Sequence, residues 1–185
     1  MEIQNACVLI TGASKGIGAA IARSFAKQGA HVILVARSTD EIEQLAHQLN
    51  GSSFSVDLTD PAQLDGFIER VEREISPIDI LINNAGIETQ DFVEDIEEHK
   101  ISDVLATNLL APIRLTRQAL PQMIERGRGH LVYTSSMAAI TPAPGLAAYC
   151  ASKAGLSRFA ETVRMETKGT GVHVTTMHLL SLIHI

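Results

Sequence analysis

Short runs of apolar and β-branched residues alternate along this chain with longer stretches whose apolar residues recur every three or four positions. Within the short runs nearly every residue is hydrophobic, which is typical of parallel strands covered on both faces. The longer stretches follow a helical period, as at Ile17, Ile21 and Phe25. We therefore predict six strands, at residues 7–11, 31–36, 53–56, 79–82, 130–135 and 172–177.

These strands and the helical stretches between them predict one fold class. Strands that alternate with helices form α/β domains, so we expect a doubly wound parallel sheet with right-handed crossovers. Two helical stretches carry finer predictions. Residues 64–75 place their apolar side chains on one helical face. Residues 97–126 should kink or divide at Pro112 and Pro121, because proline lacks the N–H that continues a helix.

Composition narrows the class of protein. The 185 residues, 45% apolar and 19% charged, suit one globular domain. A formal net charge of -6 argues against nucleic acid as a main partner, and no apolar stretch reaches the length of about 20 residues that a membrane helix needs. The N-terminus lacks the basic region of a signal peptide. Cys7 and Cys150 are predicted to be buried, reduced thiols, which indicates a cytoplasmic protein.

The sequence TGASKGIG, at residues 11–18, follows the first predicted strand and opens a helix. Gly12 permits a tight turn, Gly16 lets the backbone approach a pyrophosphate, and Gly18 permits close packing of helix on strand. The N–H groups at the start of the helix favour phosphate. Glycine spacing alone is a weak signal, and its place between a strand and a helix favours a dinucleotide site. The predicted contacts are Gly12, Ser14, Lys15, Gly16, Ile17 and Gly18.

Charged residues extend this site toward the second and third strands. Arg37 follows the second strand, where an acidic residue would bind the ribose 2′-hydroxyl of NAD and a cation suits the 2′-phosphate of NADP. With Lys15 it predicts NADP(H) in preference to NAD(H); the alternative is two solvated surface charges. Asp57 ends the third strand and could face the adenine. Asp60 is the better candidate for capping the helix that begins near Pro61.

A second group of candidate residues lies later in the chain. Tyr149 and Lys153 are four residues apart, so they share one face of a helix. A fixed ammonium stabilises a phenolate and moves the pKa of tyrosine from about 10 toward neutrality, where general acid–base catalysis is efficient. Residues 134–136, Thr-Ser-Ser, end the fifth strand at the sheet edge where α/β proteins bind ligands. A Tyr-x-x-x-Lys pair by itself recurs by chance in many helices.

Together these motifs resemble the short-chain dehydrogenase/reductase family, in its ordinary short branch. The resemblance covers residues 7–178 and rests on segments in the family's order: TGASKGIG (11–18), NNAG (83–86), TNLLAP (107–112), YTSSM (133–137) and YCASK (149–153). It implies a Rossmann-like dinucleotide-binding domain over residues 1–179. It also implies an NADP(H)-dependent oxidoreductase that interconverts a carbonyl and an alcohol by hydride transfer.

The resemblance implies a role for each matching residue. Tyr149 would be the general acid when a carbonyl is reduced, and Lys153 would lower its pKa and bind the nicotinamide ribose. Ser136, rather than Ser135, would hold the substrate oxygen. Asn108 would position a water that links Lys153 to solvent. Further cofactor contacts would come from Asp57, Leu58, Asn83, Ala85 and Gly86.

The resemblance also implies partners and leaves alternatives open. Relatives act on small molecules and pair as homodimers or homotetramers through the helices that contain Asn108 and Tyr149. The seven histidines show no metal-ligand spacing, so no metal is predicted. An epimerase or dehydratase on the same fold is one alternative, and the glycine spacing counts against it. A non-catalytic dinucleotide-binding protein is another, although such proteins commonly lose the tyrosine or the lysine.

The last residues depart from the family's pattern. Leu179 and Leu180 stand where the family has a Pro-Gly turn, ahead of a seventh strand and a terminal helix. Residues 180–185 can be encoded by ctg-tct-ctt-ata-cac-atc, a transposase end sequence used in preparing DNA sequencing libraries. We therefore expect residues 180–185 to be a non-native tail on a truncated gene, which would make the chain an inactive fragment of such an enzyme if the missing part is essential.

Sequencing of the source gene past the codon for His178 tests this expectation. We expect a Pro-Gly turn followed by some tens of further codons, because the family's fold needs a seventh strand and a terminal helix. The same codons for residues 180–185, followed directly by a stop codon, would contradict the prediction.

Overall fold

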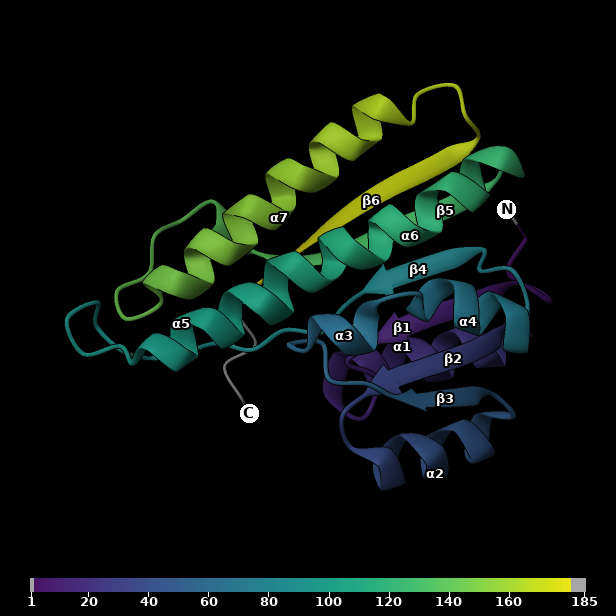
Figure 1. Cartoon of the computed structure of the whole chain (residues 1–185), viewed down its shortest axis with the longest axis horizontal. Coiled ribbons are helices and arrows are strands. Elements are labelled where there is room, and N and C mark those ends of the chain that lie inside the picture. The colour runs from purple at the N-terminus through teal and green to yellow at the C-terminus, as the bar shows by residue number, and fades with distance from the viewer. Residues whose placement is uncertain (1, 181–185) are drawn as a thin grey trace.

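The computed structural model describes residues 2–180, which form one six-stranded parallel sheet with helices on both faces (Figure 1). This is the predicted doubly wound sheet, with strand order β3-β2-β1-β4-β5-β6. The strands are β1 (Cys7–Thr11), β2 (His31–Ala36), β3 (Ser52–Ser55), β4 (Ile80–Asn83), β5 (Gly129–Ser136) and β6 (Val172–Leu179). β1 and β2 have the predicted bounds, and β6 extends past its predicted end to Leu179.

Helices connect each strand to the next. They are α1 (Gly16–Lys27), α2 (Thr39–Leu49), α3 (Pro61–Leu64), α4 (Phe67–Glu74), α5 (Glu98–Leu105), the π-helix η1 (Ala106–Leu110), α6 (Ala111–Glu125), the short 3₁₀-helix η2 (Met137–Ala139) and α7 (Ala147–Glu166). The order of connections reverses at β1, which pairs with β2 on one side and with β4 on the other. In a sheet of this kind a crevice opens at the carboxyl ends of the strands where the order reverses.

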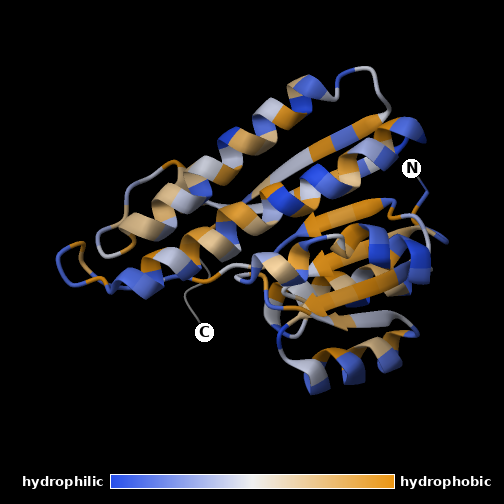
Figure 2. Cartoon of the chain, in the orientation of Figure 1, coloured by the Kyte–Doolittle hydropathy of each residue, from blue (hydrophilic) through white to orange (hydrophobic). Residues whose placement is uncertain are grey.

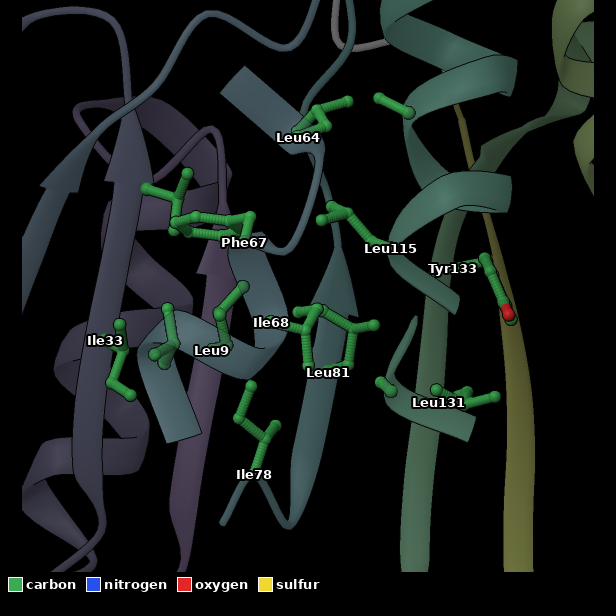
Figure 3. Packing of buried hydrophobic residues seen from close by; sticks show 14 of the residues in the cluster. Leu9, Ile33, Leu64, Phe67, Ile68, Ile78, Leu81, Leu115, Leu131 and Tyr133 are labelled. Atoms are coloured by element: carbon green, nitrogen blue, oxygen red, sulfur yellow. The ribbon is translucent and has the colours of Figure 1, made fainter. Parts of the chain in front are cut away.

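The sheet separates two hydrophobic layers, because successive residues of a strand face opposite sides. In β1, Leu9 packs toward α4, α6 and α7, whereas Val8 and Ile10 pack toward α1 and α2. Figure 2 shows the central strands as hydrophobic and the helices as two-sided. Figure 3 shows the first layer at close range, with Phe67 of α4 and Leu115 of α6 against the strands. The sheet is therefore covered by a hydrophobic layer on each face.

β6 is an exception to the prediction that strands are covered on both faces. Val172 and Val174 pack toward α7, but His173 and Thr175, on the other face, are exposed. The reason is that α1 and α2 pack over β1 and β2, and of β6 only Met177 contacts that layer. The alternation of apolar and polar residues in β6 therefore fits a strand buried on one face.

The predicted helix over residues 64–75 is two helices. α3 ends at Leu64 and α4 begins at Phe67, with Gly66 between them at a φ of 62°. This left-handed conformation suits glycine and interrupts the helix. The apolar residues still share one layer, since Leu64, Phe67 and Ile68 all belong to the same cluster. Asp60 caps α3 as predicted, because its Oδ1 accepts a hydrogen bond of 2.9 Å from the N–H of Ala62.

The predicted division of residues 97–126 occurs at the π-helix directly before Pro112. There the N–H of Ala111 bonds to the carbonyl of Ala106, one residue further back than in an α-helix. Pro121, in contrast, lies inside α6 without dividing it. Pro121 and Arg117 are both exposed, so water can reach the carbonyl of Arg117 that the proline leaves without its usual donor.

Two further features of the described residues concern the cysteines and the tail. Cys7 is buried and Cys150 is half-buried, and both are free thiols, so the prediction of burial fails for Cys150. The predicted non-native tail, residues 180–185, lies outside the described residues except for Leu180. Within residues 2–180, none of the helices combines the length and apolar character that a membrane span requires.

Candidate active site

A cleft of about 640 Å³ lies at the carboxyl ends of β1, β2, β4 and β5, where the strand order reverses. Its walls come from the loop before α1, the ends of β2 and β3, the segment after β4, the end of β5 and the start of α7. The cleft thus brings together almost all of the predicted site residues: Gly12, Ser14, Lys15, Gly16, Ile17, Gly18, Arg37, Asp57, Leu58, Ala85, Gly86, Ser136, Tyr149 and Lys153. Asn83 and Asn108 are not part of the described cleft wall.

The glycine loop has the geometry that a dinucleotide requires. Gly12 has a φ of 66°, and a Cβ there would lie 2.7 Å from the Cα of Ala85, so a larger residue would push the β4 segment away. A Cβ on Gly18 would collide with the carbonyl of Gly12. Gly16 (φ 56°) faces open space. The first turn of α1 carries no acidic residue and no side-chain cap, so its N–H groups remain available to an anion.

Asn84, which sequence reasoning missed, joins the glycine loop to the end of β4. Its Nδ2 donates to the carbonyls of Thr11 (3.0 Å) and Gly12 (3.4 Å), and its N–H donates to the hydroxyl of Thr11. Asn84 also lines the cleft. The neighbouring Asn83 is buried, and its amide has no hydrogen-bond partner among the described residues. The two asparagines are adjacent in sequence, so the sequence alone does not show which of them lines the cleft. Their side chains differ because successive residues at the end of a strand face opposite sides of the sheet.

The far end of the cleft is positively charged on one side. Lys15 and Arg37 both line it, from the glycine loop and from the end of β2. Asp57, after the neighbouring strand β3, lies close to Arg37, and its Oδ1 accepts hydrogen bonds from the N–H (2.9 Å) and the hydroxyl (2.8 Å) of Thr59. The backbone bond from Thr59 lowers the pKa of Asp57, and the hydroxyl of Thr59 and the charge of Arg37 act in the same direction. Asp57 is therefore a carboxylate at neutral pH.

Tyr149 and Lys153 lie at the other end of the cleft, one turn apart on α7. The Lys153 ammonium, on a side chain that is almost fully buried, donates a hydrogen bond of 2.8 Å to the carbonyl of Thr134. Its Nζ is 5.7 Å from the centre of the Tyr149 ring. α7 and the end of β5 thereby place an ammonium, a phenol and the hydroxyl of Ser136 in one corner of the cleft.

The pKa values of this pair differ from the sequence expectation. Burial raises the pKa of Tyr149, the nearby charge of Glu88 acts in the same direction, and the hydroxyl of Ser136 opposes them. The ammonium of Lys153 donates to the carbonyl of Thr134, and burial outweighs any lowering of the pKa of Tyr149 by its charge. Desolvation lowers the pKa of Lys153 to about 8. Burial therefore dominates both groups.

Ser135 and Ser136 have different surroundings. The hydroxyl of Ser135 is buried and bonds to Ser157 (2.8 Å) and to the carbonyl of Lys153 (3.3 Å), so it anchors α7 to β5. The hydroxyl of Ser136 accepts a hydrogen bond from the N–H of Ala138. It also acts to lower the pKa of the Tyr149 phenol, against the effect of burial. Both serines line the cleft, and the hydroxyl of Ser136 is the one beside the phenol of Tyr149.

Asn108 lies behind the cleft in the π-helix and is fully buried. Its Nδ2 donates to the carbonyl of Ile87 (2.8 Å) and to the hydroxyl of Ser152 (3.0 Å), and its Oδ1 accepts from the N–H of Ile87 (2.9 Å). Both amide hydrogens are thus engaged within the protein. The main-chain carbonyl of Asn108 is a candidate acceptor for a water, because Pro112, four residues on, has no N–H to donate to it.

Comparison with known proteins supplies the family. A family model described as short chain dehydrogenase matches residues 6–180. The chain belongs to the short-chain dehydrogenase family. The matched region holds the glycine loop, the Asn84 segment and the corner formed by Ser136, Tyr149 and Lys153.

Two curated relatives illustrate the similarity. The chain is 38% identical over 175 residues to the ketoacyl reductase HetN of Nostoc sp., covering 92% of this chain and 61% of that protein. It is 32% identical over 179 residues to the 3-oxoacyl-(acyl-carrier-protein) reductase FabG of Escherichia coli, covering 96% of this chain and 73% of FabG. The chain therefore spans about three fifths of the length of HetN.

Solved structures agree with this assignment. A short-chain dehydrogenase from Streptomyces avermitilis superposes with a TM-score of 0.91 at 33% identity, covering 96% of this chain and 66% of that one. A metagenomic short-chain oxidoreductase in complex with NADP superposes with a TM-score of 0.89 at 31% identity, covering 97% and 83%. Within residues 2–180, no group of three or more His, Cys, Asp or Glu is arranged to hold a metal ion.

The lowered pKa of Lys153 predicts a pH-dependence of stability. The folded pKa is about 8 and the ordinary value is 10.5, so between these values the unfolded chain holds one more proton. The cost of burying the charge is present in full below about pH 8, and the free energy of unfolding should rise as the pH increases to about 10.5. At 1.36 kcal/mol per pKa unit, the gain is on the order of 3 kcal/mol.

Urea unfolding of the wild type and of Lys153→Met at pH 7.5 and pH 10 measures this effect. The wild type should gain stability relative to the variant as the pH rises. Lys168→Met, at an exposed lysine, is the matched control, and its difference in stability from the wild type should be the same at both pH values. A pH-independent difference between the wild type and Lys153→Met would contradict the prediction.

Proposed function

We propose that this chain carries the dinucleotide-binding and catalytic residues of an NADP(H)-dependent oxidoreductase that interconverts a carbonyl and an alcohol. The observation that carries the proposal is the arrangement of one cleft. Its far end holds the glycine loop with two cations, Lys15 and Arg37, and its near end holds Ser136, Tyr149 and Lys153. This order of residues along one cleft suits a cofactor that binds phosphate at one end and reacts at the other.

The described residues fit a nicotinamide dinucleotide. The free N–H groups of the first turn of α1 and the open space at Gly16 suit the pyrophosphate. Leu58 and the carboxylate of Asp57 suit the adenine end, and Ala85 and Gly86 form the wall between the two ends. When bound, the nicotinamide would donate or accept the hydride, which protein side chains cannot supply.

The protein's own residues would control the proton and the substrate oxygen. In the reducing direction Tyr149 donates its phenolic proton to the oxygen as the carbonyl becomes an alcohol. The hydroxyl of Ser136 would donate a hydrogen bond to the same oxygen and stabilise the negative charge that develops on it. The ammonium of Lys153, 5.7 Å from the ring centre, stabilises the phenolate that remains.

Lys153 would also replace the proton. A buried ammonium with a pKa of about 8 exchanges protons readily near neutral pH, whereas an ordinary lysine does not. A water held by the main-chain carbonyl of Asn108 would connect it to solvent. The side-chain amide of Asn108 serves a different purpose, because it is occupied by Ile87 and Ser152.

The cations at the far end support NADP(H) as the preferred cofactor. A 2′-phosphate carries about two negative charges, which a guanidinium binds through charge-assisted hydrogen bonds. The only acidic residue of the described cleft wall at this end is Asp57, which Thr59 already engages. One similar solved structure is a complex with NADP.

The substrate class and the assembly are part of the same proposal. The relatives HetN and FabG are named for the reduction of ketoacyl groups, and we extend to this chain only the chemistry of a small carbonyl or alcohol. Exposed apolar side chains near the helices of the site, at Leu110, Ile124 and Met165, support pairing with a second copy.

Tyr149→Phe tests the catalytic role directly. Turnover of NADPH with a panel of ketones and aldehydes should fall at least 100-fold, because the variant lacks the proton donor. Binding of NADPH, followed by fluorescence, should stay within about threefold of the wild type. An unchanged rate would remove Tyr149 from its role, and dinucleotide binding without turnover in the wild type would favour a non-catalytic protein.

Tyr133→Phe is the matched control for this experiment. Tyr133 lies in the core, where its hydroxyl bonds to Thr116 at 2.8 Å. Removing that bond should lower the free energy of unfolding by about 1 kcal/mol and leave turnover unchanged. The comparison separates loss of a phenol from loss of the proton donor.

Arg37→Asp tests the cofactor preference. Loss of the guanidinium and gain of a carboxylate should lower the ratio of NADPH to NADH affinity by about 10- to 100-fold, since a charged hydrogen bond contributes about 1.5–3 kcal/mol. Arg23→Asp makes the same change on the exposed face of α1 and should leave the ratio unchanged. Equal affinities of the wild type for NADPH and NADH would contradict the prediction.

A further inference from the structure

Ser152 lies on α7 between Tyr149 and Lys153, yet it faces away from the cleft. It is fully buried and is not part of the described cleft wall. A buried hydroxyl needs partners, because an unpaired polar group in the interior is costly. The hydrogen-bond partners of its hydroxyl therefore indicate the structural role of Ser152.

The hydroxyl of Ser152 makes two bonds whose directions are defined by chemistry. Its Oγ donates to the carbonyl of Tyr149 at 2.7 Å, since a carbonyl can only accept. It accepts from the Nδ2 of Asn108 at 3.0 Å, since an amide nitrogen can only donate. By donating one hydrogen bond and accepting another, the hydroxyl of Ser152 connects the first turn of α7 to the π-helix that holds Asn108.

Asn108 continues the chain of hydrogen bonds to the wall of the cleft. Its amide bonds to both the N–H and the carbonyl of Ile87, in the segment after β4. That segment touches Lys153 as well: a Cβ on Gly86 would lie 3.2 Å from Nζ of Lys153 and 3.4 Å from Oδ1 of Asn108. Two buried residues, Ser152 and Asn108, therefore connect Tyr149 to Ile87 in the wall of the cleft.

We propose that Ser152 is a positioning residue for the proposed reaction. Its hydroxyl orients the Asn108 amide and ties the backbone of Tyr149 to the Ile87 segment beside Lys153. Ser152→Ala leaves one N–H of Asn108 without an acceptor and frees the Tyr149 turn from this tie. Because proton transfer requires the phenol within hydrogen-bond reach of the substrate oxygen, small displacements lower the rate more than they lower cofactor affinity.

A first measurement needs no turnover and stands apart from the proposed function. Amide hydrogen exchange at Ile87, followed by NMR, should be at least tenfold faster in Ser152→Ala than in the wild type. Ser157→Ala is the matched control, because it also removes an α7 hydroxyl, here half-buried, and a 2.8 Å bond, to Ser135, without touching Asn108. Its Ile87 exchange should change less than twofold.

A second measurement uses turnover. In Ser152→Ala, kcat with NADPH and a carbonyl should fall about tenfold, the KM for NADPH should change less than threefold, and the pH profile of kcat should shift. In Ser157→Ala, kcat should stay within twofold. Ser152→Thr keeps the hydroxyl and should restore slow Ile87 exchange and most of kcat, although its extra methyl group lowers the melting temperature.

The outcomes separate the two proposals. Equal behaviour of Ser152→Ala and Ser157→Ala in exchange and in kcat would overturn the positioning role. Fast Ile87 exchange with an unchanged kcat would also overturn it, because the tie would then be structural only. If the wild type shows no turnover with any carbonyl, the proposed function fails, and the exchange measurement alone then decides whether Ser152 holds the Ile87 segment.

Discussion

The parallel pairing of β1 with both β2 and β4 is the constraint on which the rest of the structure depends. The loop after β1 leads to α1 on one face of the sheet, and the segment after β4 leads to α5 and α6 toward the other. The two segments diverge at the carboxyl ends of the strands and leave a crevice. Gly12 and Asn84 close the base of that crevice, one through a contact that excludes a side chain and the other through bonds to the carbonyls of Thr11 and Gly12. Every candidate site residue is placed relative to this junction.

A second junction, at Asn108, joins the parts of the cleft that come from distant segments of the chain. The π-helix places its amide between Ile87, after β4, and Ser152, on α7. Both hydrogens of the side-chain amide are engaged, so the side chain connects these two segments. The low pKa of Lys153 follows from the same burial that makes these hydrogen bonds strong. Burial therefore accounts both for the strength of the hydrogen bonds at Asn108 and for the lowered pKa of Lys153.

Several predictions failed or were refined at positions where the local sequence allows more than one structure and the tertiary environment selects one. Gly66 breaks a helix that periodicity extends from residue 64 to residue 75, whereas Pro121 fails to break one because water reaches the exposed carbonyl before it. The pair Asn83–Asn84 shows the same limit. Asn83 is the last residue of β4 and Asn84 the first after it, but only Asn84 lines the cleft, while Asn83 is buried.

The sequence by itself determined the order and type of most elements, the glycine loop, and the family-like set Ser136, Tyr149 and Lys153. These depend on local periodicity and on residue types within a few positions of one another. Only the tertiary structure decided that Asn84 lines the cleft, that Ser152 supports Asn108, and that Lys153 bonds to Thr134. Those facts rest on hydrogen bonds between residues 19 to 73 positions apart. No local pattern encodes such distances, because they depend on how separate strands and helices pack.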